Sequence, residues 1–271
     1  MTPLTLDALN GFFTSPHDAP PKWLCVLMHT AYIDETGQTT DGWIFLTGWF
    51  GNEEHWKAFM PKWKAELGNR ANLHMCKLRW GEKNRRTQDL LARLGPIPSS
   101  CGLRAAVGGL KYSDYRDLVE GSVVEKIASG YVQCLYPLVS AIVQHVPGDE
   151  RVELLFGAQE TFQEKALETL NFISRSYAGD PLYCTSTGIL KLAKFSFAAP
   201  GENSILYNPS DYLASALAHH KHDKYSRKAR WSRPILDATQ LLGRIYDRDE
   251  IRADMVRGQR KIEARNIPFF R

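Results

Sequence analysis

The sequence has no apolar run close to the roughly 20 residues that a membrane-spanning helix requires. It has no basic residue before Lys22, so we expect no secretory signal. Its five cysteines are an odd number without Cys-x-x-Cys spacing, which argues against a disulfide framework. The motifs of phosphate-binding loops, nucleophile elbows and dinucleotide-binding loops are also absent. These absences predict a protein of a reducing compartment, the cytoplasm, without a membrane partner.

What the chain does contain is typical of one or two globular domains: 271 residues, 44% apolar and 24% charged. The net charge of +4 is unevenly distributed, because residues 221–271 hold 14 Lys and Arg against 7 Asp and Glu. Clustered positive charge attracts polyanions such as nucleic acids. A solvated helical face with mixed charges explains the same pattern, so both interpretations stay open.

Hydrophobic patterning predicts an α/β domain. The apolar segments 23–34 and 43–50, separated by turn residues, predict a β-hairpin. Further strands are predicted at 102–110, 151–156 and 189–197. Helices are predicted at 53–67, 83–94, 113–146, 160–177, 209–220 and 234–265. Pro61 is expected to kink the first of these helices or end its first half. This order predicts a mixed sheet with helices packed on it.

Two acidic residues, Asp34 and Glu35, end the first predicted strand. Carboxylates at the tip of a buried strand are costly unless they are exposed, paired or metal-bound. Because successive side chains of a strand point to opposite faces, only one of the two can face a given site, and we favour Asp34. The alternative is a hairpin turn in which Asp34 bonds its own backbone.

Asp211 is the second candidate, in the first turn of the helix that Asn208 is predicted to cap and Pro209 to open. Small neighbours on this helix allow close approach to another backbone, so Asp211 could reach a metal beside the end of the Asp34 strand. The alternative is that Asp211 only caps its own helix.

Five segments together resemble a known bacterial family. They are Ile-Asp-Glu-Thr-Gly at 33–37, Phe-Leu-Thr-Gly-Trp-Phe at 45–50, the helical segment Asn52–Trp63, Leu-His-Met at 73–75, and Asn-Pro-Ser-Asp-Tyr-Leu-Ala at 208–214. In order and spacing they are similar to the family catalogued as domain of unknown function 3800, over roughly residues 28–222. The resemblance implies a ribonuclease H-like domain and a nuclease that uses Mg²⁺ or Mn²⁺ and clustered carboxylates on nucleic acid. We therefore expect an arm at 1–22, this domain at 23–222 and a basic helical extension at 223–271.

The resemblance also implies residue roles. Asp34 and Asp211 would hold the metal, Glu35 or Glu160 would assist, and His74 would contact the scissile phosphate or the attacking water. An unrelated possibility for His74 is an ordinary, partly buried side chain.

The chain departs from the family pattern at two positions. Gly157 stands where members often carry an acid after the strand at 151–156, and Lys77 replaces an acid after His74. These departures leave open an alternative function, a catalytically impaired nucleic-acid-binding protein on the same fold.

Basic residues close to Trp80 are candidates for nucleic-acid contacts. They are Lys77, Arg79, Lys83, Arg85 and Arg86. They could hold a phosphate backbone while Trp80 stacks on a base, or they could form a solvated loop. The sequence does not decide between RNA and DNA or fix an oligomeric state.

Overall fold

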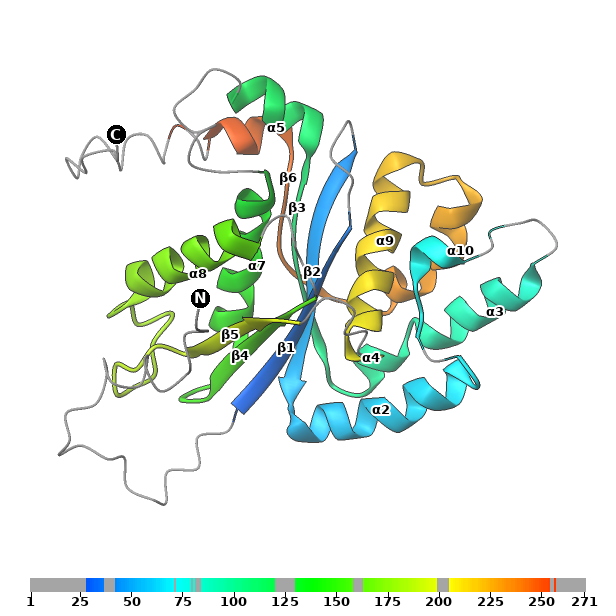
Figure 1. The fold of residues 1–271 in the computed structure, drawn as a ribbon, viewed down its shortest axis with the longest axis horizontal. Helices are drawn as coiled ribbons and strands as arrows, with labels where there is room; N and C mark the ends of the chain where they lie inside the picture. Colours follow the sequence, from blue (N-terminus) through cyan, green and yellow to red (C-terminus); the bar gives the residue numbers. More distant parts are fainter. Residues whose placement is uncertain are drawn as a thin grey trace, which may run out of the picture.

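The protein was analysed as a computed structural model, which describes residues 28–36, 42–70, 72–78, 80, 84–119, 130–157, 163–198, 205–253 and 256. Within these residues a mixed sheet lies between two layers of helices (Figure 1). Its six strands are β1 (Met28–Thr36), β2 (Trp43–Asn52), β3 (Arg104–Lys111), β4 (Arg151–Phe156), β5 (Leu192–Phe197) and β6 (Leu241–Tyr246). The expected α/β class with a mixed sheet and flanking helices is confirmed.

The strand order is β5-β4-β1-β2-β3-β6. Strand β2 is antiparallel to both β1 and β3, whereas β4 is parallel to β1, β5 to β4, and β6 to β3. The predicted hairpin is therefore confirmed as β1–β2. Strands β1 and β4 end at the same edge of the sheet because they are parallel.

Helices cover both faces of the sheet (Figure 1). One face carries α2 (Glu53–Leu67), α3 (Arg85–Leu94), α4 (Ile97–Ser100), α9 (Asn208–His222) and α10 (Arg227–Asp237), with the short 3-10 helices η1 (Met75–Lys77) and η2 (Ile205–Tyr207). The other side carries α5 (Tyr112–Val119), α7 (Gly130–His145) and α8 (Gln163–Tyr177). We call these the α9 face and the α7 face.

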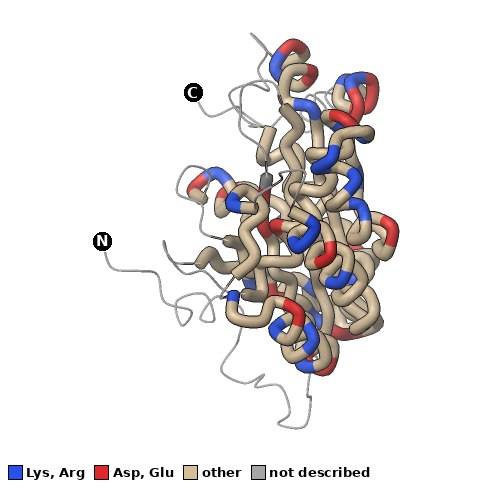
Figure 2. The backbone as a smooth tube through the Cα atoms, turned by 90° about the vertical axis from the view of Figure 1, so that its right-hand side faces the viewer, with Lys and Arg blue, Asp and Glu red and all other residues tan. Residues whose placement is uncertain are grey.

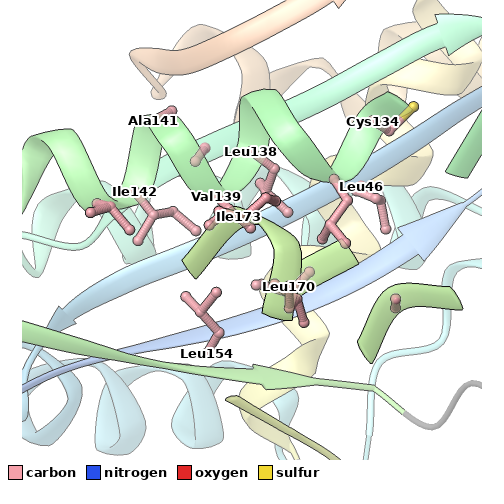
Figure 3. Close-up of a cluster of buried hydrophobic side chains, with 14 of the residues drawn as sticks. Leu46, Cys134, Leu138, Val139, Ala141, Ile142, Leu154, Leu170 and Ile173 are labelled. Atoms are coloured by element: carbon pink, nitrogen blue, oxygen red, sulfur yellow. The ribbon is translucent and has the colours of Figure 1, made fainter. Parts of the chain in front are cut away.

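Alternation along the central strands divides the core in two. On β1, Ala31 and Ile33 join the apolar cluster of the α7 face, and Tyr32 packs against the cluster of the α9 face. Figure 3 shows the α7-face cluster, in which Leu138 and Leu170 meet the sheet. Burial of about 25 cal/mol per Å² of apolar surface makes these two layers the main stabilising contribution.

Helix α7 lies unusually close to β3 because of a glycine. A Cβ built on Gly108 would lie 1.8 Å from the carbonyl oxygen of Cys134. No side chain fits in that space, so glycine is required for the approach of the helix to the strand.

Helix α2 forms as its sequence predicts. The Asn52 side chain accepts a hydrogen bond from the backbone N–H of His55 at 3.1 Å and caps the helix. The apolar residues at helical spacing, Trp56 and Phe59 among them, are buried on the sheet. Pro61 does not end the first half of the helix, which continues to Leu67.

The segment 113–146 differs from the single long helix that its pattern predicts. It contains two helices, α5 and α7, separated by residues 120–129, which lie outside the described residues. Tertiary packing decides here, because α5 lies at the end of β3 whereas α7 packs across β2, β3 and β6 (Figure 1).

The helical prediction for the C-terminal extension is wrong at residues 241–246. They form strand β6 at the edge of the sheet, and within the described part of the extension α10 and residues 248–253 are helical. Leu-Leu-Gly-Arg-Ile-Tyr is a short run with apolar residues at both ends, and pairing with β3 outweighs the helical composition of the tail around it.

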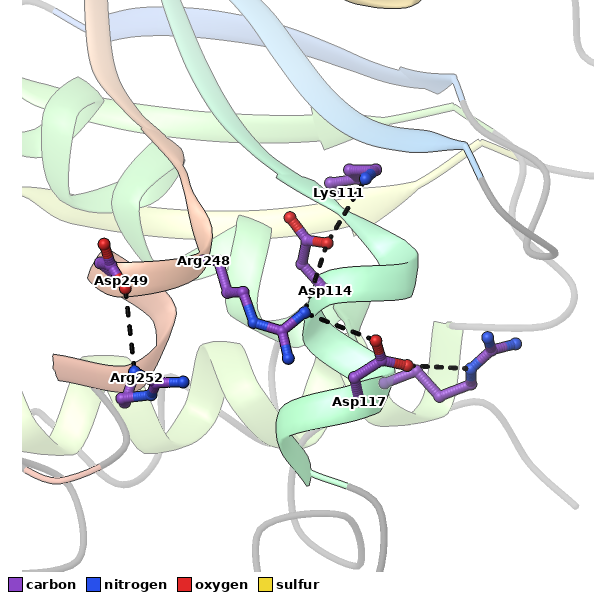
Figure 4. A network of polar contacts seen from close by, with 7 residues as sticks. Lys111, Asp114, Asp117, Arg248, Asp249 and Arg252 are labelled. Carbon is purple, nitrogen blue, oxygen red and sulfur yellow. Dashed lines mark hydrogen bonds and ion pairs between the residues drawn. The ribbon is translucent and has the colours of Figure 1, made fainter.

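Ion pairs join the start of the segment after β6 to α5 (Figure 4). Arg248 lies 3.9 Å from the Asp114 carboxylate and 3.5 Å from that of Asp117. Such exposed pairs contribute little energy, roughly 0–1 kcal/mol each. Their position shows that the first part of the predicted extension packs on the same sheet as the rest. The predicted arm 1–22 and residues 257–271 lie outside the described residues.

Among the described helices none is long and apolar enough to cross a bilayer.

Candidate functional site

The side chain of Asp34 lies on the α9 face of the sheet. Asp34 pairs across the hairpin with Thr47, and residues opposite each other in a sheet share a face. The hydroxyl of Thr47 donates to the carbonyl oxygen of Ser210 in α9 at 2.8 Å, which fixes the face. Asp34 therefore projects toward the first turn of α9.

Helix α9 is fastened to the sheet by its first turn. Trp49 Nε1 donates to the carbonyl oxygen of Pro209 at 3.2 Å, and Ser210 Oγ donates to the carbonyl oxygen of Tyr32 at 2.7 Å. With the bond from Thr47, three hydrogen bonds join the two strands of the hairpin to one helical turn. The residue that follows, Asp211, is thus held at a fixed height beside β1.

The 72–78 segment closes the site from a third direction. Asn208 Oδ1 accepts the backbone N–H of Leu73 at 2.9 Å, and Asp211 Oδ2 accepts that of Met75 at 2.9 Å. These two bonds place His74 next to Asp211; burial raises the pKa of the Asp211 carboxyl, and the Met75 hydrogen bond and then His74 oppose the rise. Three segments far apart in sequence therefore bring Asp34, His74 and Asp211 together.

The predicted caps of α9 are both wrong. Asn208 is the first residue of the helix and Tyr207 occupies the cap position without a capping side-chain bond. The side chains of Asn208 and Asp211 serve the 72–78 segment instead. The alternative in which Asp211 only caps its own helix is excluded by this contact.

Electrostatics give the two carboxyl groups unusual properties. Burial, and next the charge of Asp211, raise the pKa of Asp34 to about 8, although a hydrogen bond from Glu35 N to Asp34 Oδ1 at 2.9 Å opposes the shift. Burial also raises the pKa of Asp211, against the hydrogen bond from Met75. Two acids in this position are stabilised by a proton or by a cation.

Gly157, at the end of β4, adjoins Asp34. Its backbone N–H donates to the carbonyl oxygen of Ile33 at 2.9 Å. A Cβ built on Gly157 would lie 3.1 Å from Asp34 Oδ1. A side chain at position 157 therefore points into the site, and an acid there would join Asp34 and Asp211.

Glu35 lies on the other face. It pairs with Leu46, a member of the α7-face core. Burial raises the pKa of the Cys134 thiol in α7, and the charge of Glu35 raises it further. The β1 alternation thus separates it from Asp211, as the choice of Asp34 over Glu35 expected. The predicted assisting role of Glu35 has no support from this placement.

The remaining predicted residues do not form one group. Lys77, Arg85 and Arg86 are exposed, the first in η1 and the others at the start of α3. Glu160, Arg79 and Lys83 lie outside the described residues.

A divalent cation would find two carboxylates here. Asp34 has one oxygen that accepts no hydrogen bond from a described residue, whereas both oxygens of Asp211 accept one, from Met75 and, at 3.3 Å, from Ser215 Oγ. No group of three or more His, Cys, Asp or Glu in the described part of the chain is arranged to hold a metal. The donor set fits the minimum for Mg²⁺, which binds through one or two carboxylates and completes its shell with water and phosphate.

A separate cavity of about 100 Å³ lies at the opposite edge of the sheet, lined by His29, His55, Arg104 and Glu150 among others. Its lining contains neither Asp34 nor Gly157, which lie at the C-terminal ends of β1 and β4. We therefore treat the Asp34–Asp211 site as distinct from it.

The sequence pattern indicates Asp34 and Asp211 but not Thr47 and Ser210, the residues whose hydrogen bond anchors α9 on the sheet. Thr47 is fully buried, and Ser210 is as well. A lone threonine inside the apolar run 43–50 is a signal that could have been used, because a buried hydroxyl needs a partner. Nothing in the sequence identifies that partner as the first turn of α9.

Searches against protein-family models and against curated proteins find no match for this chain.

Proposed function

We propose that this protein is a nuclease that hydrolyses phosphodiester bonds with Mg²⁺ or Mn²⁺ held between Asp34 and Asp211. The observation that carries the proposal is the pair of buried acids itself, which the fold brings together from two elements 177 positions apart in sequence; burial, and next the charge of Asp211, raise the pKa of Asp34. Buried carboxyl groups with raised pKa values concentrate at functional sites. We further propose that the fold is ribonuclease H-like, in agreement with a β1–β2–β3 meander extended by β4 and β5 parallel to β1.

A bound divalent cation would supply charge neutralisation for the phosphate and polarise the attacking water. The chain's own residues would do the rest. Asp34, on a rigid central strand, and Asp211, fixed by the first turn of α9, would hold the cation. His74 would contact the scissile phosphate or accept a proton from the water, since its neighbour Met75 is anchored on Asp211.

The alternative function is nucleic-acid binding without cleavage. It is favoured by Gly157, which leaves vacant the position from which a third carboxylate would face Asp34. It is favoured also by Lys77, which brings a cation rather than an acid to the segment beside the site. Under this alternative, Asp34 keeps its proton at neutral pH and the site remains structural.

Cleavage assays separate the two. Labelled single-stranded, duplex and RNA–DNA hybrid substrates are incubated with purified protein and either Mn²⁺, Mg²⁺ or EDTA. We expect cleavage with a metal, none with EDTA, and a loss of at least 100-fold for Asp34→Asn and for Asp211→Asn, a magnitude seen when one electrostatic contact to a transition state is removed. Glu168→Gln, an exposed acid on α8, is the matched control and should be unchanged. Metal-dependent cleavage that survives in both aspartate variants would refute the assignment.

A further inference from the structure

Lysine, arginine and aromatic side chains are interleaved on the α9 face beyond the candidate site. We call the set the basic–aromatic surface, and its members are Trp43, Trp80, His219, Lys221, Lys224, Tyr225, Arg227, Lys228 and Trp231. They come from β2, from the loop before α3, and from the end of α9 and the start of α10. Figure 2 looks onto this side of the molecule and shows Lys and Arg on its helices, with acidic positions among them.

Residues 221–228 supply the cations of four cation–π contacts. Lys221 Nζ lies 5.0 Å from the centre of the Trp43 ring, Lys224 Nζ 5.0 Å from Tyr225, and Lys228 Nζ 5.9 Å from Trp80. The fourth joins Arg227 to Trp231 at 5.9 Å. The general frequency is about one per 70–80 residues, so this clustering is far above the average.

The cations of this surface are available to an anionic ligand. Lys221, Lys224 and Lys228 are exposed, and none forms an ion pair with a carboxylate among the described residues. Burial, and next the charge of Lys228, lower the pKa of His219 to about 4.

The aromatic rings provide flat apolar area beside these cations. Trp80 packs on Trp231 with ring centres 6.2 Å apart and planes 28° from parallel, and it contacts His219 edge to face. Tyr225, in the turn between α9 and α10, is 77% exposed. An exposed ring beside lysines is suited to stacking on a base.

The surface is continuous with the candidate site along α9. Ser210 bonds Thr47 and Lys221 lies over Trp43, so the helix runs along β2. The distance is about 16 Å along the helix at 1.5 Å per residue, and about 13 Å along the strand at 3.3 Å per residue. The basic end of α9 therefore lies about three helical turns from Asp211 on the same helix.

We propose that the basic–aromatic surface binds single-stranded nucleic acid. Phosphates would pair with Lys221, Lys224 and Lys228, and an unpaired base would stack on Tyr225 beside them. A duplex offers phosphates but keeps its bases stacked inside, so it uses only the cationic half of the surface. The inference deepens the proposed function by naming the form of its substrate, but binding on this surface does not require the Asp34–Asp211 site.

Binding is measured in EDTA by fluorescence anisotropy with labelled oligonucleotides of about 12 residues, within the 4–16 nucleotides of known single-strand sites. The full chain is titrated with a single strand, the duplex of the same sequence, and heparin as a competitor without bases. We expect the single strand to bind most tightly. We expect Tyr225→Ala to weaken it roughly fivefold or more, and the double variant Lys224→Gln/Lys228→Gln to reduce the slope of log K against log salt by about 1.4.

Matched controls stand on α8, on the opposite side of the molecule. Phe172, 61% exposed, is changed to Ala and the exposed Lys165 to Gln, and both variants should bind like the parent chain. The proposal would be overturned if the parent chain bound no nucleic acid at low salt or preferred the duplex. It would also be overturned if heparin displaced the single strand equally well from the parent chain and from Tyr225→Ala.

The two proposals can fail separately. Asp34→Asn, which should abolish cleavage, should leave the affinity measured in EDTA unchanged. Binding that depends on the surface residues, without any metal-dependent cleavage, would refute the nuclease proposal and support the binding surface. Metal-dependent cleavage, with cleavage and affinity both unchanged in the surface variants, would refute the binding surface and support the nuclease proposal.

Discussion

Replacing Asp34 by Asn should make the protein more stable at neutral and alkaline pH. The folded chain holds the Asp34 proton up to a pKa of about 8, whereas the unfolded chain releases it near the ordinary aspartate pKa of 3.8. Between these values the native state binds more protons than the unfolded state, so the stability of the parent chain falls as pH rises. Asn has nearly the same shape and no titration, so it removes this loss.

The size of the effect follows from the shift. A separation of about four pKa units at 1.36 kcal/mol each gives an upper limit of about 5–6 kcal/mol at pH 8 and above. The free energies of unfolding of the parent chain and the Asp34→Asn variant should coincide below about pH 4. They should then diverge by at most about 1.4 kcal/mol per pH unit.

The assay is urea unfolding in EDTA at a series of pH values from 4 to 9, followed by circular dichroism. Glu168→Gln is the control for removal of an exposed carboxylate. Mn²⁺ at a hundred times its dissociation constant should then stabilise the parent chain by about 2.7 kcal/mol, and Asp34→Asn by much less. Parallel pH profiles for the parent and the variant would refute the reasoning, since Asp34 would then titrate normally in the folded state.

Three further changes test other contacts. Gly157→Glu places a carboxylate beside Asp34, because the new Cβ lies 3.1 Å from Asp34 Oδ1. This variant should be less stable in EDTA and should bind Mn²⁺ more tightly, as measured by calorimetry. Unchanged Mn²⁺ affinity would show that position 157 does not face a cation. Thr47→Val removes the buried bond to Ser210 and should cost about 1–3 kcal/mol in urea unfolding, with a matching loss of Mn²⁺ binding; full stability would contradict the anchoring of α9 by the hairpin. Gly108→Ala forces a methyl group to 1.8 Å from Cys134 O and should destabilise by more than the 1–3 kcal/mol of ordinary overpacking, and a normal melting temperature would show that α7 can move away from β3.

The sequence predicts the sheet well because its strands are short, apolar and bounded by clear turns. Capping by Asn52 and the apolar stripe of α2 are local signals, and both are confirmed. The alternation rule on β1 also separates Asp34 from Glu35 before any coordinates are considered. Local patterns of this kind survive folding because each is consistent with the packing around it.

The errors arise where distant segments decide. Asn208 and Asp211 look like caps in the sequence, but the 72–78 segment supplies partners that no local pattern reveals. The composition of the tail indicates a helix, but residues 241–246 form a strand because they pair with the otherwise unpaired edge of β3. The basic–aromatic surface is also hidden, since Trp43 and Lys221 are far apart in the chain and meet only when α9 lies along β2.

The most direct test of the Asp34–Asp211 metal site is a crystal of the protein grown with Mn²⁺ and measured at a wavelength where manganese scatters anomalously. A peak within about 2.0–2.6 Å of an oxygen of each aspartate is the predicted result, the range that hard divalent cations keep from oxygen ligands. Manganese bound elsewhere, or not at all while Asp211 keeps its bond to Met75 and Asp34 its proton, would contradict the account.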